Sequence, residues 1–263
     1  MTIHYNNILQ KQSLAVRTNV LPEVKKVINT IEPDFDSVEK YKTNIVEWLK
    51  PVVDLTDFHV YPMNGITEGL NWWYYQDNRS VYMDEGDYQW IQSRGNMYDN
   101  CIKYVSVPSA IHGNFTTIPE NTPTAVDLAY VGSTKIKKIN LPKNVEYVFY
   151  SFSKPFGIRN VRTGWIFTKQ KDSKLDALIH SAKYYNYFAN SVSEAIIKNF
   201  DVDFIYNSLY NKQKTICEEL DIVPSDSVWL ATSTREEYQK FRRSGDTARL
   251  CLAGIYNEQE TLT

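Results

Sequence analysis

Short hydrophobic runs recur along the chain and alternate with stretches that have the periodicity of amphipathic helices. The runs are rich in β-branched and aromatic residues, which favour strands. Alternation of this kind is typical of an α/β fold with a mostly parallel central sheet flanked by helices. Strands are predicted at 58–63, 80–84, 102–107, 125–131, 145–150, 163–168 and 227–232.

Helices are predicted at 37–49, 67–75, 172–182, 192–211 and 235–243. The fourth follows a serine-rich start and carries Glu194, which suits a first helical turn. Two of the predicted strands end in charged or hydroxyl residues, as in sheets whose strand ends carry a site. We expect a large domain over residues 38–190, and a reduced small α+β domain made of residues 191–263 with an N-terminal arm, 1–37.

Composition narrows the class of protein. The 263 residues carry a net charge of −2, so no basic field indicates a nucleic-acid partner. Three cysteines without paired spacing and four scattered histidines give no disulfide or metal pattern. No apolar run approaches the length of a membrane span, and the first residues lack signal-peptide features. These observations favour a cytoplasmic protein with no bound metal and no membrane partner.

A lysine with an unusual setting follows the strand predicted at 145–150. Lys154 lies in the pattern S-x-S-K-x-x-G-x-x-x-x-R-x-G, which runs from Ser151 through Arg162 to Gly164. A lone lysine after a strand is usually a solvated surface residue, but a desolvated amine near cationic groups can act as a nucleophile. The hydroxyls, the glycines and the arginine around Lys154 favour the second interpretation.

Asp127 stands in the apolar run Ala125-Val126-Asp127-Leu128-Ala129-Tyr130-Val131. A carboxylate in such surroundings is costly unless it has a partner. The partner is either a structural one, such as a buried arginine or a backbone cap, or the protonated ring nitrogen of a cofactor. Tyr130 follows three residues later.

Three further segments complete the pattern. Asn64-Gly65-Ile66-Thr67 lies between a predicted strand and a helix, where N–H groups favour an anion. Tyr88 follows the next strand, with Trp90 close by. Arg249 lies in R-x-x-x-A-G near the C-terminus, and its planar fork suits a carboxylate.

These five elements occur in the order found in the fold-type I pyridoxal-phosphate (PLP) enzymes, the aspartate aminotransferase superfamily, which the chain resembles over residues 60–255. The resemblance implies pyridoxal 5'-phosphate as cofactor, a Schiff base at Lys154, and catalytic roles for Lys154, Asp127 and Tyr130. It assigns the cofactor phosphate to Ser151, Arg162 and the backbone of Gly65, Ile66 and Thr67. It assigns the pyridine nitrogen to Asp127, the phenolic oxygen to Tyr130, the ring face to Tyr88 and the substrate α-carboxylate to Arg249.

The chain also departs from this family. It is shorter than ordinary members, and the stretch N-P-x-G before the Asp127 strand is replaced by Ser109-Ala110-Ile111-His112-Gly113-Asn114-Phe115. The helix that normally follows that stretch is expected to be missing. Asn114 is the candidate for the lost contact to the phenolic oxygen. Nothing in the sequence selects a second substrate-binding arginine among Arg94, Arg159 and Arg243.

The resemblance implies an aminotransferase that moves an amino group between an amino acid and a 2-oxo acid, working as a homodimer. Two alternatives stay open. The same residues serve decarboxylation, elimination or acyl condensation, and the reduced length is also compatible with a PLP-binding protein that is not a catalyst.

Overall fold

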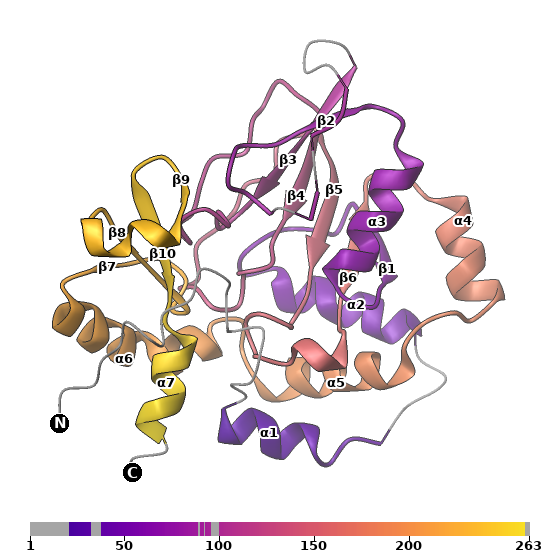
Figure 1. Ribbon diagram of the computed structural model, residues 1–263. Coiled ribbons are helices and arrows are strands. Elements are labelled where there is room, and N and C mark those ends of the chain that lie inside the picture. The colour runs from indigo at the N-terminus through magenta and orange to yellow at the C-terminus, as the bar shows by residue number, and fades with distance from the viewer. Residues whose placement is uncertain (1–20, 33–37, 89, 92, 96–99, 261–263) are drawn as a thin grey trace.

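The structure is a computed structural model that describes residues 21–32, 38–88, 90–91, 93–95 and 100–260. Its centre is a six-stranded sheet with the strand order β1-β6-β5-β4-β3-β2 (Figure 1). Strands β2 to β5 pair in parallel, while β6 runs antiparallel to both β1 and β5. The mostly parallel sheet is thereby confirmed. The strands are β1 (His59–Pro62), β2 (Ser80–Tyr82), β3 (Cys101–Ser106), β4 (Thr124–Asp127), β5 (Val145–Tyr150) and β6 (Trp165–Thr168).

Both faces of this sheet are covered, because successive side chains of each strand point to opposite sides. Phe149 and Ile166 join the core beneath α3 (Ile66–Gln76) and α4 (Ser173–Asp176). Their neighbours Val148 and Phe167 join the other core, beneath α2 (Val38–Leu49) and α5 (Tyr187–Asn199). Helix α1 (Pro22–Ile28) packs on α5 (Figure 1). The predicted sheet flanked by helices is therefore present.

A cluster of aromatic rings fills the second core below the loop that carries Lys154. The Phe152 ring makes edge contacts to Trp48 at 5.0 Å and to Phe156 and Trp165 at 5.3 Å, measured between centroids. Tyr150 stacks on Trp165 at 6.0 Å. Much of the high aromatic content thus serves packing.

The C-terminal part forms a second, smaller sheet with the order β7-β8-β10-β9. It lies beside the main sheet, at the left of Figure 1. The division of the chain into domains at residue 190 stays a prediction. The elements are α6 (Phe204–Leu220), β7 (Val223–Pro224), β8 (Leu230–Ser233), β9 (Arg242–Ser244), β10 (Thr247–Cys251) and α7 (Ala253–Glu260).

The strand predicted at 125–131 is shorter than expected. It ends at Asp127, since the Asp127 carboxylate accepts a hydrogen bond from the Ala129 N–H at 2.8 Å and turns the backbone. The Val131 N–H then closes a turn on the carbonyl of Leu128. Asp127 therefore lies at the carboxyl end of the strand and not within it. The strand predicted at 145–150 has the expected bounds.

The single helix predicted at 192–211 is wrong, because α5 and α6 are separate helices. Phe200 is extended, and its carbonyl accepts a hydrogen bond from Trp48 Nε1 at 2.8 Å. This contact between distant residues ends α5. Glu194 lies inside α5 and not in a first turn, and its carboxylate accepts hydrogen bonds from Asn44 Nδ2.

The remaining boundaries differ in smaller ways. The stretch predicted as one helix at 172–182 is α4 followed by a π-helix, Ala177–Ser181. The helix predicted at 235–243 is a 3-10 helix, Glu236–Phe241, which leads directly into β9. The predicted helix start at residue 37 lies outside the described residues.

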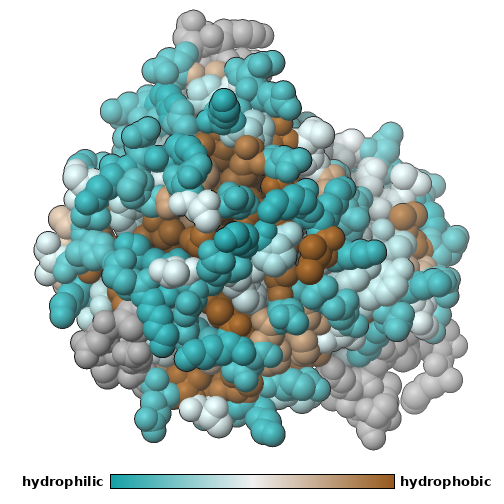
Figure 2. All heavy atoms as spheres, turned by 180° about the vertical axis from the view of Figure 1, so that it is seen from behind, coloured by the Kyte–Doolittle hydropathy of each residue, from teal (hydrophilic) through white to brown (hydrophobic). Residues whose placement is uncertain are grey.

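The connection from β3 to β4, residues 107–123, contains no helix, as predicted. None of the described helices is long and apolar enough to cross a membrane. Figure 2 shows the side of the molecule opposite to Figure 1, where hydrophobic residues reach the surface in separate patches among hydrophilic ones.

The core contains one matched pair of buried tyrosines that differ in hydrogen bonding. Tyr150 Oη has no hydrogen-bond partner among the described residues, whereas Tyr104 Oη donates to Asp127 at 2.6 Å. We expect Tyr150→Phe to raise the free energy of unfolding by up to about 1 kcal/mol, because an unpaired hydroxyl leaves the core. Tyr104→Phe is expected to lower it by about 1–3 kcal/mol. Urea denaturation measures both, and a loss of stability in Tyr150→Phe would contradict this account.

Candidate functional site

Strand pairing brings three distant segments of the chain together. In the register of β6 with its two neighbours, Trp165 lies opposite both Pro62 and Tyr150. The β1–β6 ladder continues with a hydrogen bond from the Met63 N–H to the Gly164 carbonyl at 2.7 Å. The residues just beyond these strand ends, 63–67, 151–154 and 162–164, therefore form one contiguous surface.

Gly65 and Gly164 are in close backbone contact at the centre of this surface. A methyl group at Gly164 would lie 2.6 Å from Gly65 Cα, and one at Gly65 would lie 2.7 Å from Arg162 Nη2. Gly65 also has a φ of +83°, which favours glycine. Only with glycine at both positions can the start of α3, the loop of residues 162–164 and the Arg162 guanidinium be in contact. The result is a small cradle with a positive charge on one side.

Helix α3 begins at this cradle with no side-chain cap on its first turn. The N–H groups of Ile66 and Thr67 lie at the positive end of the helix dipole, which attracts anions. Glu68 bends back to accept hydrogen bonds from Asn64, whose carbonyl accepts one from Arg162 Nη2 at 3.0 Å. The cradle thus combines backbone donors with an exposed guanidinium, a donor set that suits a phosphate group.

Ser151 has a structural contact in this surface. Its buried hydroxyl donates to the Thr163 carbonyl at 2.6 Å, and it accepts from the Ser153 N–H at 3.0 Å. Ser151 therefore ties the Lys154 loop to the Arg162 loop. The hydroxyl proton that Ser151 would need for a hydrogen bond to a phosphate is already donated to the Thr163 carbonyl.

The amine of Lys154 lies between two aromatic rings. Its Nζ is 4.3 Å from the ring centroid of Tyr130 and 5.5 Å from that of Tyr88. Tyr88 Oη lies 3.5 Å from Thr67 Oγ1 at the start of α3. Trp90 is exposed and donates to Asn71, so Tyr88 is the aromatic residue that faces the lysine.

Asp127 is buried on the same side of the sheet as α3. Burial raises the pKa of its carboxyl above the ordinary value. The charge of Lys154 and the hydrogen bonds from Tyr104 and from the Ala129 N–H oppose that rise without cancelling it. The site therefore contains a desolvated carboxylate that lacks a full positive partner.

A second buried carboxylate, Asp87, escaped the sequence analysis. It accepts hydrogen bonds from the Ser106 hydroxyl at 2.6 Å and from the Tyr88 N–H at 2.7 Å. Burial raises its pKa, and these donors only partly offset the effect. Asp87 fixes the loop that presents Tyr88. Its position in the acidic run Asp84-Glu85-Gly86-Asp87 resembles a solvated turn, so no pattern in the sequence indicated a buried role.

Arg249 enters the site from β10 and is almost fully buried. Its Nη1 donates to the Ala110 carbonyl and lies 3.4 Å from Tyr130 Oη. Arg243, the middle residue of β9, donates to the same Ala110 carbonyl at 2.9 Å. Burial lowers the pKa of Arg243, and the neighbouring charge of Arg249 lowers it further. Of the three arginines left open by the sequence, Arg243 is therefore the one that lies beside Arg249.

These charges act on Tyr130. Burial alone raises the pKa of a phenol, but Lys154, Arg249 and Arg243 outweigh that effect and lower the pKa of Tyr130 below its ordinary value. The Tyr130 hydroxyl is thus easier to ionise than an ordinary tyrosine, and it lies between the lysine and the two arginines.

Asn114 lies in the connection between β3 and β4, and its side-chain oxygen accepts a hydrogen bond from the Asp226 N–H at 2.8 Å. Asp226 in turn accepts from the Phe115 N–H at 2.8 Å. Asn114 thus joins this connection to the C-terminal sheet, and no hydrogen bond among the described residues links it to Lys154 or Tyr130. Its contact with the cofactor stays a prediction.

Comparison with known proteins gives no match to any family model and none to any curated protein. Solved structures do match. A PLP-bound C-S lyase from Staphylococcus hominis has a TM-score of 0.70 at 12% identity, over 99% of this chain and 93% of its own. The chain has the fold of PLP-dependent enzymes of fold type I.

Two further structures have this fold and different activities. Histidinol-phosphate aminotransferase from Sinorhizobium meliloti matches with a TM-score of 0.63 at 13% identity, over 89% of this chain and 83% of its own. L-threonine-O-3-phosphate decarboxylase from Porphyromonas gingivalis matches with a TM-score of 0.61 at 14% identity, over 94% and 98%. At this identity the PLP-enzyme fold is what the likeness establishes, and the chemistry has to be argued from the site.

The buried carboxyl of Asp127 allows a test of whether burial raises its pKa. A raised folded pKa means that the stability contributed by Asp127 is present below its unfolded pKa of about 3.8 and is lost as pH rises through the folded pKa. In protein without a bound ligand, we expect wild type to lose stability relative to Asp127→Asn as the pH rises above about 4. Urea denaturation across this range measures the difference.

Asp77→Asn is the matched control. Burial raises the pKa of Asp77, but hydrogen bonds from Arg79 outweigh it and the pKa is lowered. The stability that Asp77 contributes is present above its unfolded pKa and is lost as the pH falls. The difference in stability between wild type and Asp77→Asn must therefore change with pH in the opposite direction to the difference for Asp127→Asn. The same slope in both variants would contradict the assignment for Asp127.

Proposed function

We propose that this protein binds pyridoxal 5'-phosphate and is an enzyme that acts on amino acids. One observation carries the proposal. Lys154 Nζ lies 4.3 Å from the Tyr130 ring, and Arg249 Nη1 lies 3.4 Å from the hydroxyl of the same tyrosine. An amine and a buried guanidinium thus converge on one phenol, which suits a substrate whose amino group and carboxylate are bonded to the same carbon.

The residues present fit the cofactor. At the start of α3, the first N–H groups of the helix and the exposed Arg162 guanidinium would hold the cofactor phosphate. The desolvated carboxylate of Asp127 would pair with the pyridinium nitrogen, which supplies the missing positive charge. When bound, the cofactor supplies an aldehyde that takes up the amino group and a ring that accepts electrons from the α-carbon.

Lys154 would hold that aldehyde covalently and, once released by the substrate, move the α-proton at its Nζ. The Tyr88 and Tyr130 rings restrict where the amine can go. The lowered pKa of Tyr130 favours a hydrogen bond to a developing negative charge. These residues orient the reacting atoms and handle the proton.

Arg249 would grip the α-carboxylate, because its fork gives two charge-assisted hydrogen bonds. The nearby Arg243 adds a second positive charge within the same site. We propose that the preferred substrates carry a second anionic group, which Arg243 receives.

Within this class we propose transamination with a 2-oxo acid as acceptor, in a cytoplasmic homodimer. The similarity to an aminotransferase supports it, and the similarity to a lyase and a decarboxylase keeps those reactions as the second candidate. Formation of pyridoxamine phosphate from an added amino acid distinguishes transamination from release of carbon dioxide or ammonia.

Cofactor attachment is tested by the visible absorbance spectrum. After incubation with PLP and removal of excess, we expect wild type to show a yellow band that Lys154→Ala lacks. Activity should fall by about 10²–10⁴-fold in the variant. Lys138→Ala, an exposed lysine whose amine bonds the Lys50 carbonyl, is the control and should keep the band. A chain with no band in either form would be no PLP enzyme.

The role of Arg243 is tested by substrate preference. We expect Arg243→Met to lower kcat/KM for aspartate or glutamate by about 10–100-fold, the effect of a lost charge-assisted hydrogen bond, and to change that for alanine or leucine little. Arg235→Met, on the surface, is the control. An equal fall for both kinds of amino acid would assign Arg243 to support of Arg249 instead.

A further inference from the structure

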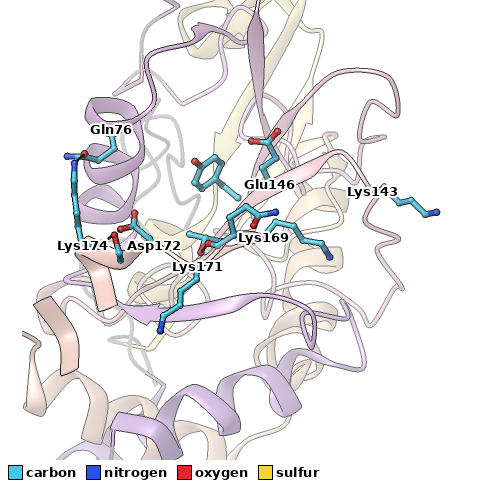
Figure 3. Close-up of a pocket in the computed structure, with 11 residues that line it drawn as sticks. Gln76, Lys143, Glu146, Lys169, Lys171, Asp172 and Lys174 are labelled. Carbon is cyan, nitrogen blue, oxygen red and sulfur yellow. Dashed lines mark hydrogen bonds between the residues drawn. The ribbon is translucent and has the colours of Figure 1, made fainter. Parts of the chain in front are cut away.

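A second pocket lies at the opposite end of the sheet from Lys154. It encloses about 600 Å³ between the start of β5, the end of β6 and the loop that leads into α4 (Figure 3). Glu146 lines it at the beginning of β5, whereas Lys154 follows the end of that strand. At about 3.3 Å per residue, the strand alone separates the two by roughly 13 Å. The pocket is therefore distinct from the site described above.

The pocket is lined by an excess of lysines. Lys143 comes from the turn before β5, Lys169 and Lys171 come from the loop after β6, and Lys174 comes from the first turn of α4. Figure 3 shows Lys174 next to Gln76, which comes from the end of α3, and Lys143 farther out and pointing away from the other lysines. Three lysines within six residues thus line the same pocket. These three, called the loop lysines below, are Lys169, Lys171 and, at the first turn of α4, Lys174.

The loop lysines have only weak partners. Lys171 Nζ lies 3.0 Å from Asp176, and Lys169 Nζ lies 3.7 Å from the exposed Asp57. Lys174 Nζ donates to a neutral group, the Gln76 side-chain oxygen, at 2.6 Å. Exposed ion pairs of this kind contribute little stability, so these amines can turn to a ligand.

The two carboxylates that line the pocket are already neutralised or bonded elsewhere. Glu146 receives two hydrogen bonds from the Arg79 guanidinium, at 2.5 and 3.0 Å. Asp172 accepts from Trp72 Nε1 at 3.0 Å and caps the N–H groups of Lys174 and Leu175. No ion pair among the described residues joins either carboxylate to the lysines, so lysines outnumber carboxylates in the lining and the pocket keeps an excess of positive charge.

An aromatic wall completes the pocket. Tyr147 lines it, and its ring packs against the buried Trp73 at 6.0 Å, which holds the phenol in place. A volume of about 600 Å³ is typical of small-molecule sites. Lysines suit phosphate groups as point charges, and a fixed aromatic ring suits a planar base. We propose that this pocket binds a nucleotide with two or more phosphates.

Isothermal titration of the full-length protein, loaded with PLP and freed of excess, tests the proposal with ATP, tripolyphosphate and adenosine. We expect ATP to bind with a Kd below about 1 mM, more tightly than tripolyphosphate, and adenosine not to bind measurably. The double variant Lys171→Gln/Lys174→Gln should weaken ATP binding about tenfold. Since the pocket lies outside the Lys154 site, this result does not depend on the proposed activity.

The matched control is Lys198→Gln/Lys214→Gln, two exposed lysines with ion pairs on α5 and α6. It removes the same charge and should leave the Kd for ATP within about twofold. Equal weakening in both double variants would mean that net charge alone attracts ATP and would overturn the site. Equal affinity for ATP and tripolyphosphate would overturn the role of Tyr147. No binding of ATP would overturn the whole proposal.

Discussion

The antiparallel pairing of β6 with both β1 and β5 is the constraint on which the site depends. Because β6 pairs with both strands, it brings the start of α3 together with the Lys154 loop and the Arg162 loop, although α3 lies far from both loops in the sequence. The contact of Gly65 with Gly164 locks this arrangement, since no side chain fits between them. A slip of one residue in this register would turn every side chain of the strand to the other face.

Charge compensation is the second constraint. The site buries Asp127 and Asp87 on one side and the Arg249 guanidinium on the other, with Lys154 and Tyr130 between them. Burial raises the pKa of both carboxyls, so it is costly for the protein alone to keep them ionised. A ligand with a cationic ring nitrogen and anionic groups would relieve this cost on both sides. The same imbalance that lowers stability would suit a ligand of mixed charge.

The compact connection between β3 and β4 joins the two sheets. In place of a helix, residues 107–123 cross the sheet end directly, and the Ala110 carbonyl accepts hydrogen bonds from both Arg243 and Arg249. Asn114 fastens the same segment to the C-terminal sheet through Asp226. The two sheets are thus joined at the point where the arginines enter.

The sequence by itself indicated the six strands of the main sheet, the lysine motif and the acidic residue in an apolar run, because each depends on local pattern and on the cost of burying charge. It also indicated the missing helix. It did not predict β7, β9 and β10 of the smaller sheet. It could not show that Trp48 ends α5, or that Asp127 ends its strand, because these are contacts between side chains and backbone that a periodic pattern does not contain. Arg243 and Asp87 looked like solvated charges for the same reason. Only the tertiary structure decided their burial, since burial depends on which distant segments pack over a residue and not on its neighbours in the chain.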